Sequence, residues 1–383
     1  MPRKSSFLGA CAFYLSFFAV INCGQGRDVY VATNGSDKAV GSLAEPWRTI
    51  THAYARAEPG IIIHVLPGVY DDYTKGWGLR LSKKGKANRP IVLRSSVQGG
   101  AIIEGHNRDD RNQGFYIEGD YHVIDGFQIR NCPKGGIKVY GDANRILNNA
   151  IHHNGNRPSP SNYGQDGIYS EKGTRDNVYI GNSIHDNGRT GSNYDHGLYL
   201  CGKNEFVIRN LLYRNATCGL QIAGYTTVGN MKVYNNVVAW NGTTGIILWK
   251  RLDGIEIKNN ILYKNGRYGL GSWEARGKGV VVDHNLFFGN GAGDYTFTAG
   301  KSDYTYTLGK VIRDDPCFVN GAREGFDAHL RPRSPAIGAG IRVRDVFPRI
   351  EEDASSPTNP RCDLGAFVCE GVTSATASRD SKP

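Results

Sequence analysis

The chain has 383 residues, a length that allows one large core or two domains. Hydrophobic residues make up 39%, which excludes a disordered chain and a membrane bundle, and the 50 glycines indicate many strands and turns. A formal charge of +10 suits an acidic polysaccharide as partner, although a generally basic surface would give the same number. Nucleic acid is not expected as a partner, because no recognition motif appears.

The first residues have the order of a secretory signal. Arg3 and Lys4 precede an apolar run over about residues 7–21, and small residues follow in "NCGQG". The run is short for a membrane span, and no later segment is apolar enough to be one. We therefore expect a signal peptide over 1–26 and a secreted or extracytoplasmic protein, with a lipid anchor on Cys23 as the lesser alternative.

The first element expected after the signal lies in "EPWRTITHAYARA", residues 45–57. Its pattern predicts a short amphipathic helix, which can cover the open end of the stack of strands that follows. At the other end, "RSPAIGAG" and "CDLGAFVCE" are expected to close the C-terminal side, and residues 371–383 are expected to be disordered. One folded domain over 27–370 is predicted between these ends.

An internal repeat dominates the middle of the chain. The motif is seen in "NNAIHHNG" (148–155) and "NNILYKNG" (259–266), and its asparagines recur 33, 28, 26, 24 and 25 residues apart. These asparagines are Asn149, Asn182, Asn210, Asn236, Asn260 and Asn285. Each period holds three short apolar runs separated by Gly or Asn, which are too short for useful helices and typical of strands.

Three strands and three turns in about 25 residues make one coil of a parallel β-helix. The fold class predicted is therefore all-β, a right-handed solenoid of three-strand coils with a short capping helix. Asn and Gly are expected to supply left-handed conformations at the corners, and stacked Asn side chains to hydrogen-bond from coil to coil.

Two neighbouring coils carry related strands, "DGIYS" (166–170) and "DHGLYL" (195–200). Alignment on their glycines places Asp166 beside His196 and Tyr169 beside Tyr199, with both tyrosines pointing outward. The same outward column is predicted to contain Lys138, Gln221 and Ile247.

Extra residues precede both strands, at 156–165 and 189–195, and are expected to rise as walls of a groove. In that groove Asp166 can orient the ring of His196 and favour its protonated form. A buried hydrogen bond that merely ties two coils together is the structural alternative.

A pair of cations, Lys250 and Arg251, follows the equivalent strand two coils later, in "GIILWKRLDG". In the groove they can bind a uronate carboxylate, Arg251 by a bidentate fork and Lys250 as a point charge. A solvated turn would explain the same two residues. Trp249 and Trp273 fit sugar stacking or packing under a loop.

These motifs resemble those of the β-helical mannuronan C5-epimerases and of mechanistically related uronan lyases. The similar stretches are "YGQD" (163–166), "HGLYL" (196–200) and "GIILWK" (245–250). Two departures are that the family's Asp-Pro-His is "DGI" here and that Asp195 stands where those epimerases carry arginine. Both ends of the chain also resemble exported right-handed β-helix proteins, including some pectate lyases.

Lyases and C5-epimerases both begin by removing the proton at C5, beside a carboxylate that must be neutralised. We expect His196 or Lys250 as the base, Tyr163 or Tyr199 as the acid, and Asp166 as the residue that orients His196. Arg251 is expected to hold the substrate carboxylate. Further substrate contacts are expected from Tyr169, Lys138, Gln221 and Asp195.

No cofactor is required by this chemistry, but Ca²⁺ is an open alternative with Asp166, Asp195 and Glu171 as oxygen ligands. Among the cysteines, Cys362 and Cys369 are close enough in sequence to close a loop, whereas Cys201 and Cys218 suit buried positions.

The sequence thus predicts an exported, monomeric polysaccharide lyase that acts on a uronate-containing polymer. A polyuronate C5-epimerase is the first alternative. A glycoside hydrolase and a non-catalytic carbohydrate-binding β-helix are the others.

Overall fold

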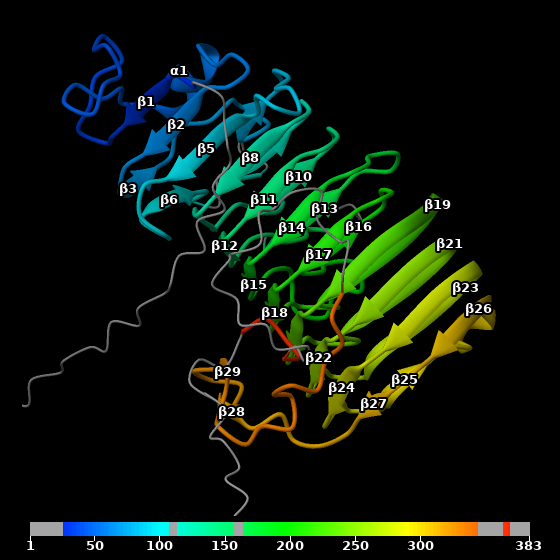
Figure 1. Cartoon of the computed structure of the whole chain (residues 1–383). Coiled ribbons are helices and arrows are strands. Elements are labelled where there is room, and N and C mark those ends of the chain that lie inside the picture. The colour runs from blue at the N-terminus through cyan, green and yellow to red at the C-terminus, as the bar shows by residue number, and fades with distance from the viewer. Residues whose placement is uncertain (1–25, 107–112, 157–163, 344–362, 368–383) are drawn as a thin grey trace, which may run out of the picture.

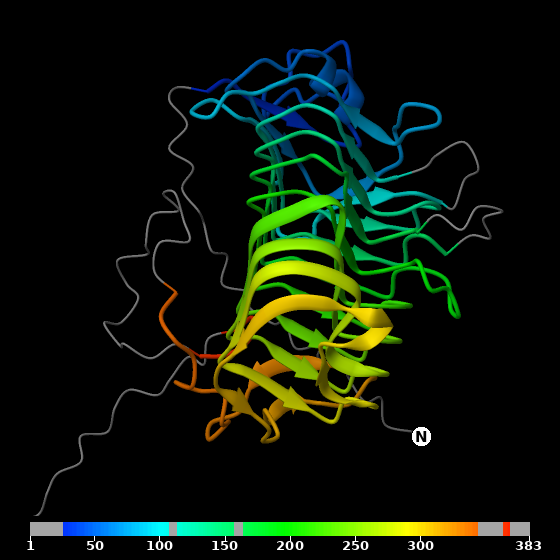
Figure 2. The same ribbon diagram turned by 90° about the vertical axis from the view of Figure 1, so that its right-hand side faces the viewer.

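The computed structural model describes residues 26–106, 113–156, 164–343 and 363–367. In these ranges the chain winds into a parallel β-helix of about nine coils, with coils stacked along one axis (Figures 1 and 2). The predicted fold class is confirmed. The expected signal peptide, the C-terminal tail, Tyr163, Cys362 and Cys369 lie outside the described residues.

Regular coils contribute a strand to each of three faces. The first face contains β4 (Leu79–Leu81), β7 (Phe115–Ile117), β10 (Ile137–Val139), β13 (Ile168–Ser170) and β16 (Leu198–Leu200). The second face contains β1 (Asp28–Val31), β2 (Ile62–Val65), β5 (Ile91–Ser95), β8 (His122–Asp125), β11 (Arg145–Leu147), β14 (Val178–Ile180) and β17 (Phe206–Ile208). The third face contains β3 (Gly68–Tyr70), β6 (Ala101–Glu104), β9 (Gln128–Arg130), β12 (Ala150–His152), β15 (Ser183–His185), β18 (Leu211–Tyr213), β20 (Val237–Ala239), β22 (Ile261–Tyr263), β24 (Asn285–Phe288) and β27 (Val311–Ile312).

In the C-terminal coils the first and second faces merge. Single strands run across the corner between them, namely β19 (Leu220–Tyr234), β21 (Ile246–Lys258) and β23 (Tyr268–Asp283). The last coil is completed by β25 (Gly293–Thr296), the 3₁₀ turn η1 (Ala299–Lys301) and β26 (Asp303–Leu308). These long strands form the smooth curved edge seen in Figure 2.

Side chains that share a register position form the core. On the first face the inward position is apolar in every coil from β10 to β21, and all of its members are almost completely buried. They are Ile137, Ile168, Leu198, Leu220 and Ile246. Burial of each such side chain stabilises the fold by roughly 1.5–3 kcal/mol, but only when a neighbouring coil covers it.

Two asparagine ladders run along the two ends of the third-face strands. In the first, the Nδ2 of Asn210 donates to the Oδ1 of Asn236 at 3.0 Å, and Asn236 donates to Asn260 at 2.9 Å. The second ladder consists of Asn154, Asn187, Asn215, Asn241, Asn265 and Asn290. Each buried amide also bonds backbone groups, so the ladders satisfy the corners that the strands leave unpaired. The predicted stacking of asparagines is confirmed.

The left-handed corners follow the expectation in part, because Asn148, Gly181 and Asn235 have positive φ, but other corners hold neither Asn nor Gly. They fall one residue before the ladder asparagines, and bulky residues occupy several of them, including Arg209 (φ 54°) and Trp240 (φ 56°). A ladder asparagine and the coils on either side fix the backbone there, and this local support offsets the strain of a non-glycine residue at positive φ.

The helix α1 (Ile50–Ala55) lies over the first coil, as predicted, and Thr49 caps its N-terminus. The described residues of the C-terminal segment do not cover the other end of the stack. Instead, Ala336 and Leu364 pack with β28 (Phe318–Asn320) and β29 (Asp327–Leu330) against the outer surface of β20, β22 and β24. The apolar outward residues Val237 and Ile261 on that surface need this cover. Within the described residues, no helix has the length and hydropathy to cross a membrane.

A carboxyl group is buried inside the coils. Glu205 accepts hydrogen bonds from the hydroxyl of Ser170 at 2.7 Å and from the Nδ2 of Asn177 at 3.3 Å, while its Oε2 has no partner among the described residues. Burial raises the pKa of Glu205 to about 7. The fold therefore favours the neutral carboxylic acid.

We predict that Asn236→Ala destabilises the protein by about 3 kcal/mol, because buried donors and acceptors on both neighbouring coils lose their partners. Urea unfolding followed by circular dichroism measures the change. The control is Asn193→Ala, which alters an exposed loop residue. An equal effect of both substitutions would contradict the proposed role of the ladder.

Glu205→Gln should stabilise the protein at alkaline pH. The folded-state pKa lies above the ordinary value of 4.5, so the native protein loses stability as pH rises from about 4.5 to about 7. Glutamine keeps the shape without the charge, and the gain relative to wild type should approach about 3 kcal/mol near pH 8. Thermal unfolding at both pH values, with the exposed Glu324→Gln as control, checks this. A pH-independent difference would refute it.

Candidate functional site

The predicted outward column exists on the first face. Lys138, Tyr169, Tyr199, Gln221 and Ile247 are consecutive partners in register. The rings of Tyr169 and Tyr199 stack at 5.4 Å, and the Nζ of Lys138 lies 5.1 Å from the centre of the Tyr169 ring. These side chains pack against one another along the axis of the β-helix, so they form a raised row on the surface and not the floor of a groove.

The Asp166–His196 pair is present but differs from the predicted geometry. The Oδ1 of Asp166 accepts the backbone N–H of His196 at 2.8 Å, whereas the Nδ1 of the ring accepts the backbone N–H of Cys218 at 3.4 Å. The expected orientation of the ring by the carboxylate is therefore wrong, because the carboxylate is used on the backbone one coil away.

Burial also determines the charge states of this pair. His196 is 3% exposed and Asp166 is 5% exposed. Burial lowers the pKa of His196 to about 4 and raises the pKa of Asp166 well above its ordinary value. The ring is thus neutral at physiological pH, which reverses the expectation that Asp166 favours the protonated ring.

Asp195 is completely buried and held by Arg189. The guanidinium donates from Nε to Oδ2 at 2.7 Å and from Nη2 to Oδ1 at 2.9 Å, and the backbone N–H of Gln165 donates to Oδ1 at 3.0 Å. This fork joins the two inserted loops. Asp195 therefore faces a protein cation, and the predicted contact with substrate does not fit its position.

The same contacts bear on calcium. Asp195 is occupied by Arg189, Asp166 bonds a backbone amide, and Glu171 accepts the hydroxyl of Tyr169 at 3.2 Å. These three carboxylates therefore do not fit a Ca²⁺ ion as they are arranged. In the described ranges, no group of three or more His, Cys, Asp or Glu side chains is arranged to hold a metal.

Cys201 and Cys218 are buried, as predicted, with Cys201 packed beside the tyrosines of the column. Burial raises the pKa of the Cys218 thiol to about 11. Both therefore act as small apolar side chains.

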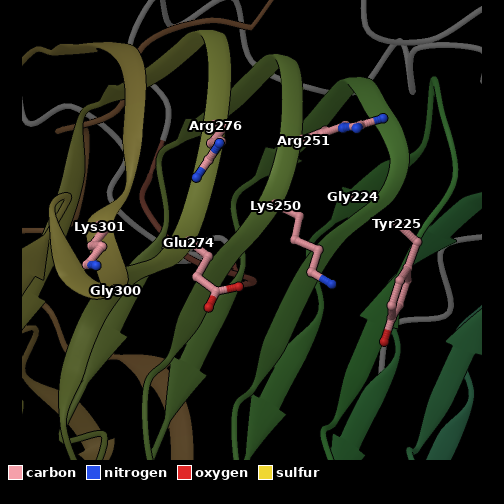
Figure 3. A pocket seen from close by; sticks show the side chains of 8 residues that line it. All are labelled: Gly224, Tyr225, Lys250, Arg251, Glu274, Arg276, Gly300 and Lys301. Atoms are coloured by element: carbon pink, nitrogen blue, oxygen red, sulfur yellow. The ribbon is translucent and has the colours of Figure 1, made fainter.

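An open groove of about 450 Å³ lies farther along the axis, on the merged corner of β19, β21 and β23 (Figure 3). Its lining contains four cations, one carboxylate and one phenol: Lys250, Arg251, Arg276, Lys301, Glu274 and Tyr225, with Gly224 and Gly300. We call this the cationic groove. The predicted pair Lys250 and Arg251 is therefore brought together with two further cations and separated from the Asp166–His196 pair.

Local irregularities of the strands build the groove. The register between β21 and β23 shifts between Trp249 and Arg251, and Lys250 at this shift has φ 59°. Glu274 has φ 50° on the next strand. Such bulges turn a side chain away from the regular alternation. Gly224 lies under Lys250 in register, and a Cβ there would come within 2.1 Å of the Arg251 carbonyl oxygen.

The charges in the groove are unpaired. Within the described residues, none of the five charged side chains has an oppositely charged partner within 4.0 Å. By contrast, many arginines elsewhere are paired: Arg80, Arg94, Arg130, Arg189, Arg214 and Arg313. Unpaired cations that share a concave surface indicate an anion-binding site.

Aromatic rings border the cationic groove. The Nζ of Lys250 lies 4.0 Å from the centre of the Trp249 ring and 5.1 Å from that of Tyr225. Trp273 is the register partner of Trp249 and is 51% exposed. The hydroxyl of Tyr199 donates to that of Tyr225 at 3.2 Å, which links the outward column to the groove.

The sequence prediction missed Tyr225, Glu274, Arg276 and Lys301. A signal existed, because "WEAR" (273–276) and "GK" (300–301) follow "WKR" (249–251) at nearly the repeat spacing. The bulges hide it, since they put Arg276 rather than Ala275 opposite Arg251.

Fold and site together define a β-helix with a groove suited to an acidic, ring-containing polymer. Residues 29–195 match the family model described as "Pel9A-like, right handed beta helix region". By sequence the chain is similar to pectate lyase L of Dickeya chrysanthemi, with 27% identity over 288 residues, covering 64% of this chain and 67% of the relative. It is also similar to pectate lyase L of Paenibacillus polymyxa, with 22% identity over 301 residues, covering 71% and 65%.

Among solved structures, pectate lyase Pel9A superposes with a TM-score of 0.66 at 20% identity, covering 91% of this chain and 98% of that one. A rhamnogalacturonan lyase superposes with a TM-score of 0.50 at 16% identity, covering 70% and 75%. The chain is therefore a right-handed parallel β-helix protein whose relatives include polysaccharide lyases. The predicted resemblance to right-handed β-helix proteins that include pectate lyases is confirmed.

Arg189→Met is predicted to destabilise the protein by about 3–5 kcal/mol, because it leaves the Asp195 carboxylate buried and unpaired. The double variant Arg189→Met/Asp195→Asn should recover most of that loss. Arg175→Met, at an exposed ion pair, is the control. Denaturant unfolding measures all three variants, and a double variant as unstable as the single one would contradict the prediction.

Proposed function

We propose that the protein is a polysaccharide lyase that cleaves a uronate-containing polysaccharide by β-elimination in the cationic groove. The observation that carries the proposal is the group of four unpaired cations beside exposed aromatic rings. It occurs on a β-helix whose sequence relatives include pectate lyases. Export through residues 1–26 would place the enzyme with such polymers.

The reaction needs one base, one source of positive charge and one proton donor. The base takes the proton from C5 of the uronate, and the electron pair of that C–H bond forms the C4=C5 double bond. The C4–O bond breaks, and the departing oxygen receives a proton. Negative charge develops on the carboxylate during this step, so fixed cations around it lower the barrier.

Lys250 is the base that this geometry favours. Its amine reaches into the groove between Trp249 and Tyr225, whereas the ring of His196 is buried and accepts a backbone hydrogen bond. A lysine acts as a base through the lone pair of its neutral amine, which accepts the C5 proton.

Arg251, Arg276 and Lys301 supply the positive charge. A guanidinium can hold a carboxylate by two parallel hydrogen bonds, which fixes its plane relative to the base. Figure 3 shows Arg251 and Arg276 on adjacent strands of the curved edge, with Lys301 on the far side of Glu274. Together these three cations can neutralise the negative charge that develops in the groove.

Proton donation is assigned to the pair Tyr199 and Tyr225. Tyr199 is almost buried, and burial raises its pKa, so it keeps its proton. Its hydroxyl donates to Tyr225, which is 50% exposed and lines the groove. Tyr225 is thus the phenol that reaches substrate, and Tyr199 can resupply its proton.

A C5-epimerase would use the same groove and the same first step, with a proton returned to the opposite face of C5. A glycoside hydrolase would need Asp166 and Asp195 as an accessible pair, and the fork from Arg189 argues against that use.

The test is to mix the purified protein with polygalacturonate, alginate blocks and glycosaminoglycans, with and without Ca²⁺, and to follow ultraviolet absorbance of unsaturated uronate. We expect absorbance to rise, and Lys250→Ala to lower kcat/KM by about 10²–10⁴-fold. Lys278→Ala, on the same curved edge but outside the groove, is the matched control.

Proton exchange at C5 without unsaturated product would instead establish an epimerase. If cleavage occurs and Lys250→Ala cleaves as fast as wild type, the assignment of the base is wrong. If no polymer is cleaved or exchanged, the lyase proposal fails for these substrates.

A further inference from the structure

Glu274 is a single carboxylate in a groove otherwise lined by cations. It lies on β23 between Lys250 of β21 and Lys301 of η1, and its side chain points into the groove (Figure 3). Within the described residues it makes no ion pair, even though three coils place cations around it. A carboxylate kept free among cations is available to a ligand.

Trp273 precedes Glu274 on the same strand and is half-exposed. Its ring is seated against the backbone of Gly300, where a Cβ would come within 2.7 Å of the ring. The absence of a side chain at residue 300 thus leaves room for the indole at the edge of the groove. An exposed indole offers a flat apolar surface that suits the C–H face of a sugar ring.

Trp273 and Glu274 favour a different kind of sugar from the one that the cations beside them favour. A carboxylate repels a substrate carboxylate at close range, but it accepts strong hydrogen bonds from sugar hydroxyls. Arg251, one strand away, attracts a carboxylate. Adjacent strands lie about 4.8 Å apart, close to the length of one sugar residue, so the two preferences fall on consecutive sugars of a bound chain.

We propose that Trp273 and Glu274 form a subsite for an uncharged sugar, next to the subsite in which Arg251 holds the uronate that Lys250 deprotonates. The preferred polymer then alternates charged and uncharged residues near the cleavage point. The inference rests on the proposed function and narrows its substrate class. The uncharged residue can be a neutral sugar or a uronate whose carboxyl group is esterified, since both lack the charge that Glu274 repels.

The test compares three substrates that differ in charge at alternate residues: polygalacturonate, methyl-esterified polygalacturonate and the backbone of rhamnogalacturonan. Wild type should show a higher kcat/KM on one or both of the last two than on polygalacturonate. Glu274→Gln should raise kcat/KM on polygalacturonate about tenfold, because it removes a repulsion between like charges, and should not raise it on the other substrates. Which of the two partly charged polymers is preferred distinguishes esterified uronate from neutral sugar.

Asp253→Asn is the matched control, because it removes one exposed negative charge on β21 outside the groove. Trp273→Ala should lower kcat/KM on the preferred substrate more than on polygalacturonate. An unchanged ratio of kcat/KM values in Glu274→Gln would overturn the inference while leaving the lyase proposal intact.

Binding gives a readout that does not depend on cleavage. Calorimetry of Lys250→Ala and of Lys250→Ala/Glu274→Gln with the same three polymers measures the preference directly. If the added substitution does not shift affinity toward polygalacturonate, the subsite is refuted, whether or not the protein cleaves any of them. If no polymer is cleaved yet the shift occurs, only the lyase proposal fails.

Discussion

Parallel stacking of coils is the constraint on which the rest of this structure depends. Backbone hydrogen bonds fix the distance between successive coils at about 4.8 Å, so residues at one register position must tolerate copies of their own kind as nearest neighbours. Inside the coils, stacked apolar residues bury one another. At the corners, stacked asparagines hydrogen-bond one another, because the side-chain amide is both a donor and an acceptor. The two ladders are therefore a consequence of the repeat as much as a cause of it.

Stacking of like-charged residues on neighbouring coils is unfavourable, because the charges repel one another. Lys250, Arg251, Arg276 and Lys301 gather on neighbouring coils, where like charges disfavour one another and no carboxylate within the described residues neutralises them in a pair. Elsewhere on the coils a cation usually meets an acid, as Arg80 meets Glu118. The unfavourable arrangement on the merged corner is best understood as a site whose negative partner is a ligand.

The fold could be predicted from the sequence because the repeat of asparagines and short apolar runs determines the length of each coil. The asparagine spacing defines the coil, and the alignment of Gly167 with Gly197 placed Tyr169 beside Tyr199 correctly. Orientation of polar groups could not be predicted in the same way. Whether Asp166 bonds the ring or the backbone of His196 depends on a rotation of a few bonds, and the partner taken by Asp195 depended on Arg189, six residues earlier in an inserted loop.

The prediction of the groove was incomplete for a related reason. Lys250 and Arg251 were visible as a pair, but Arg276 and Lys301 join them only because bulges change the count between coils. The C-terminal segment shows the same limit. Its sequence resembles a cap, yet its described residues pack on the side of the third face, where Val237 and Ile261 point outward and need cover.

The inserted loops and the Asp–His motif are conspicuous in the sequence, but burial changes what they can do. A neutral histidine and a carboxylate closed by arginine are suited to holding two long coils together. That rigidity has a direct consequence for the neighbouring groove, because Tyr199 stacks on the ring of His196 at 5.4 Å and its hydroxyl donates a hydrogen bond to the hydroxyl of Tyr225. The buried centre thereby positions the phenol that reaches the groove, and the open, charged corner, whose cations begin two coils farther on, is where we propose that a polymer binds.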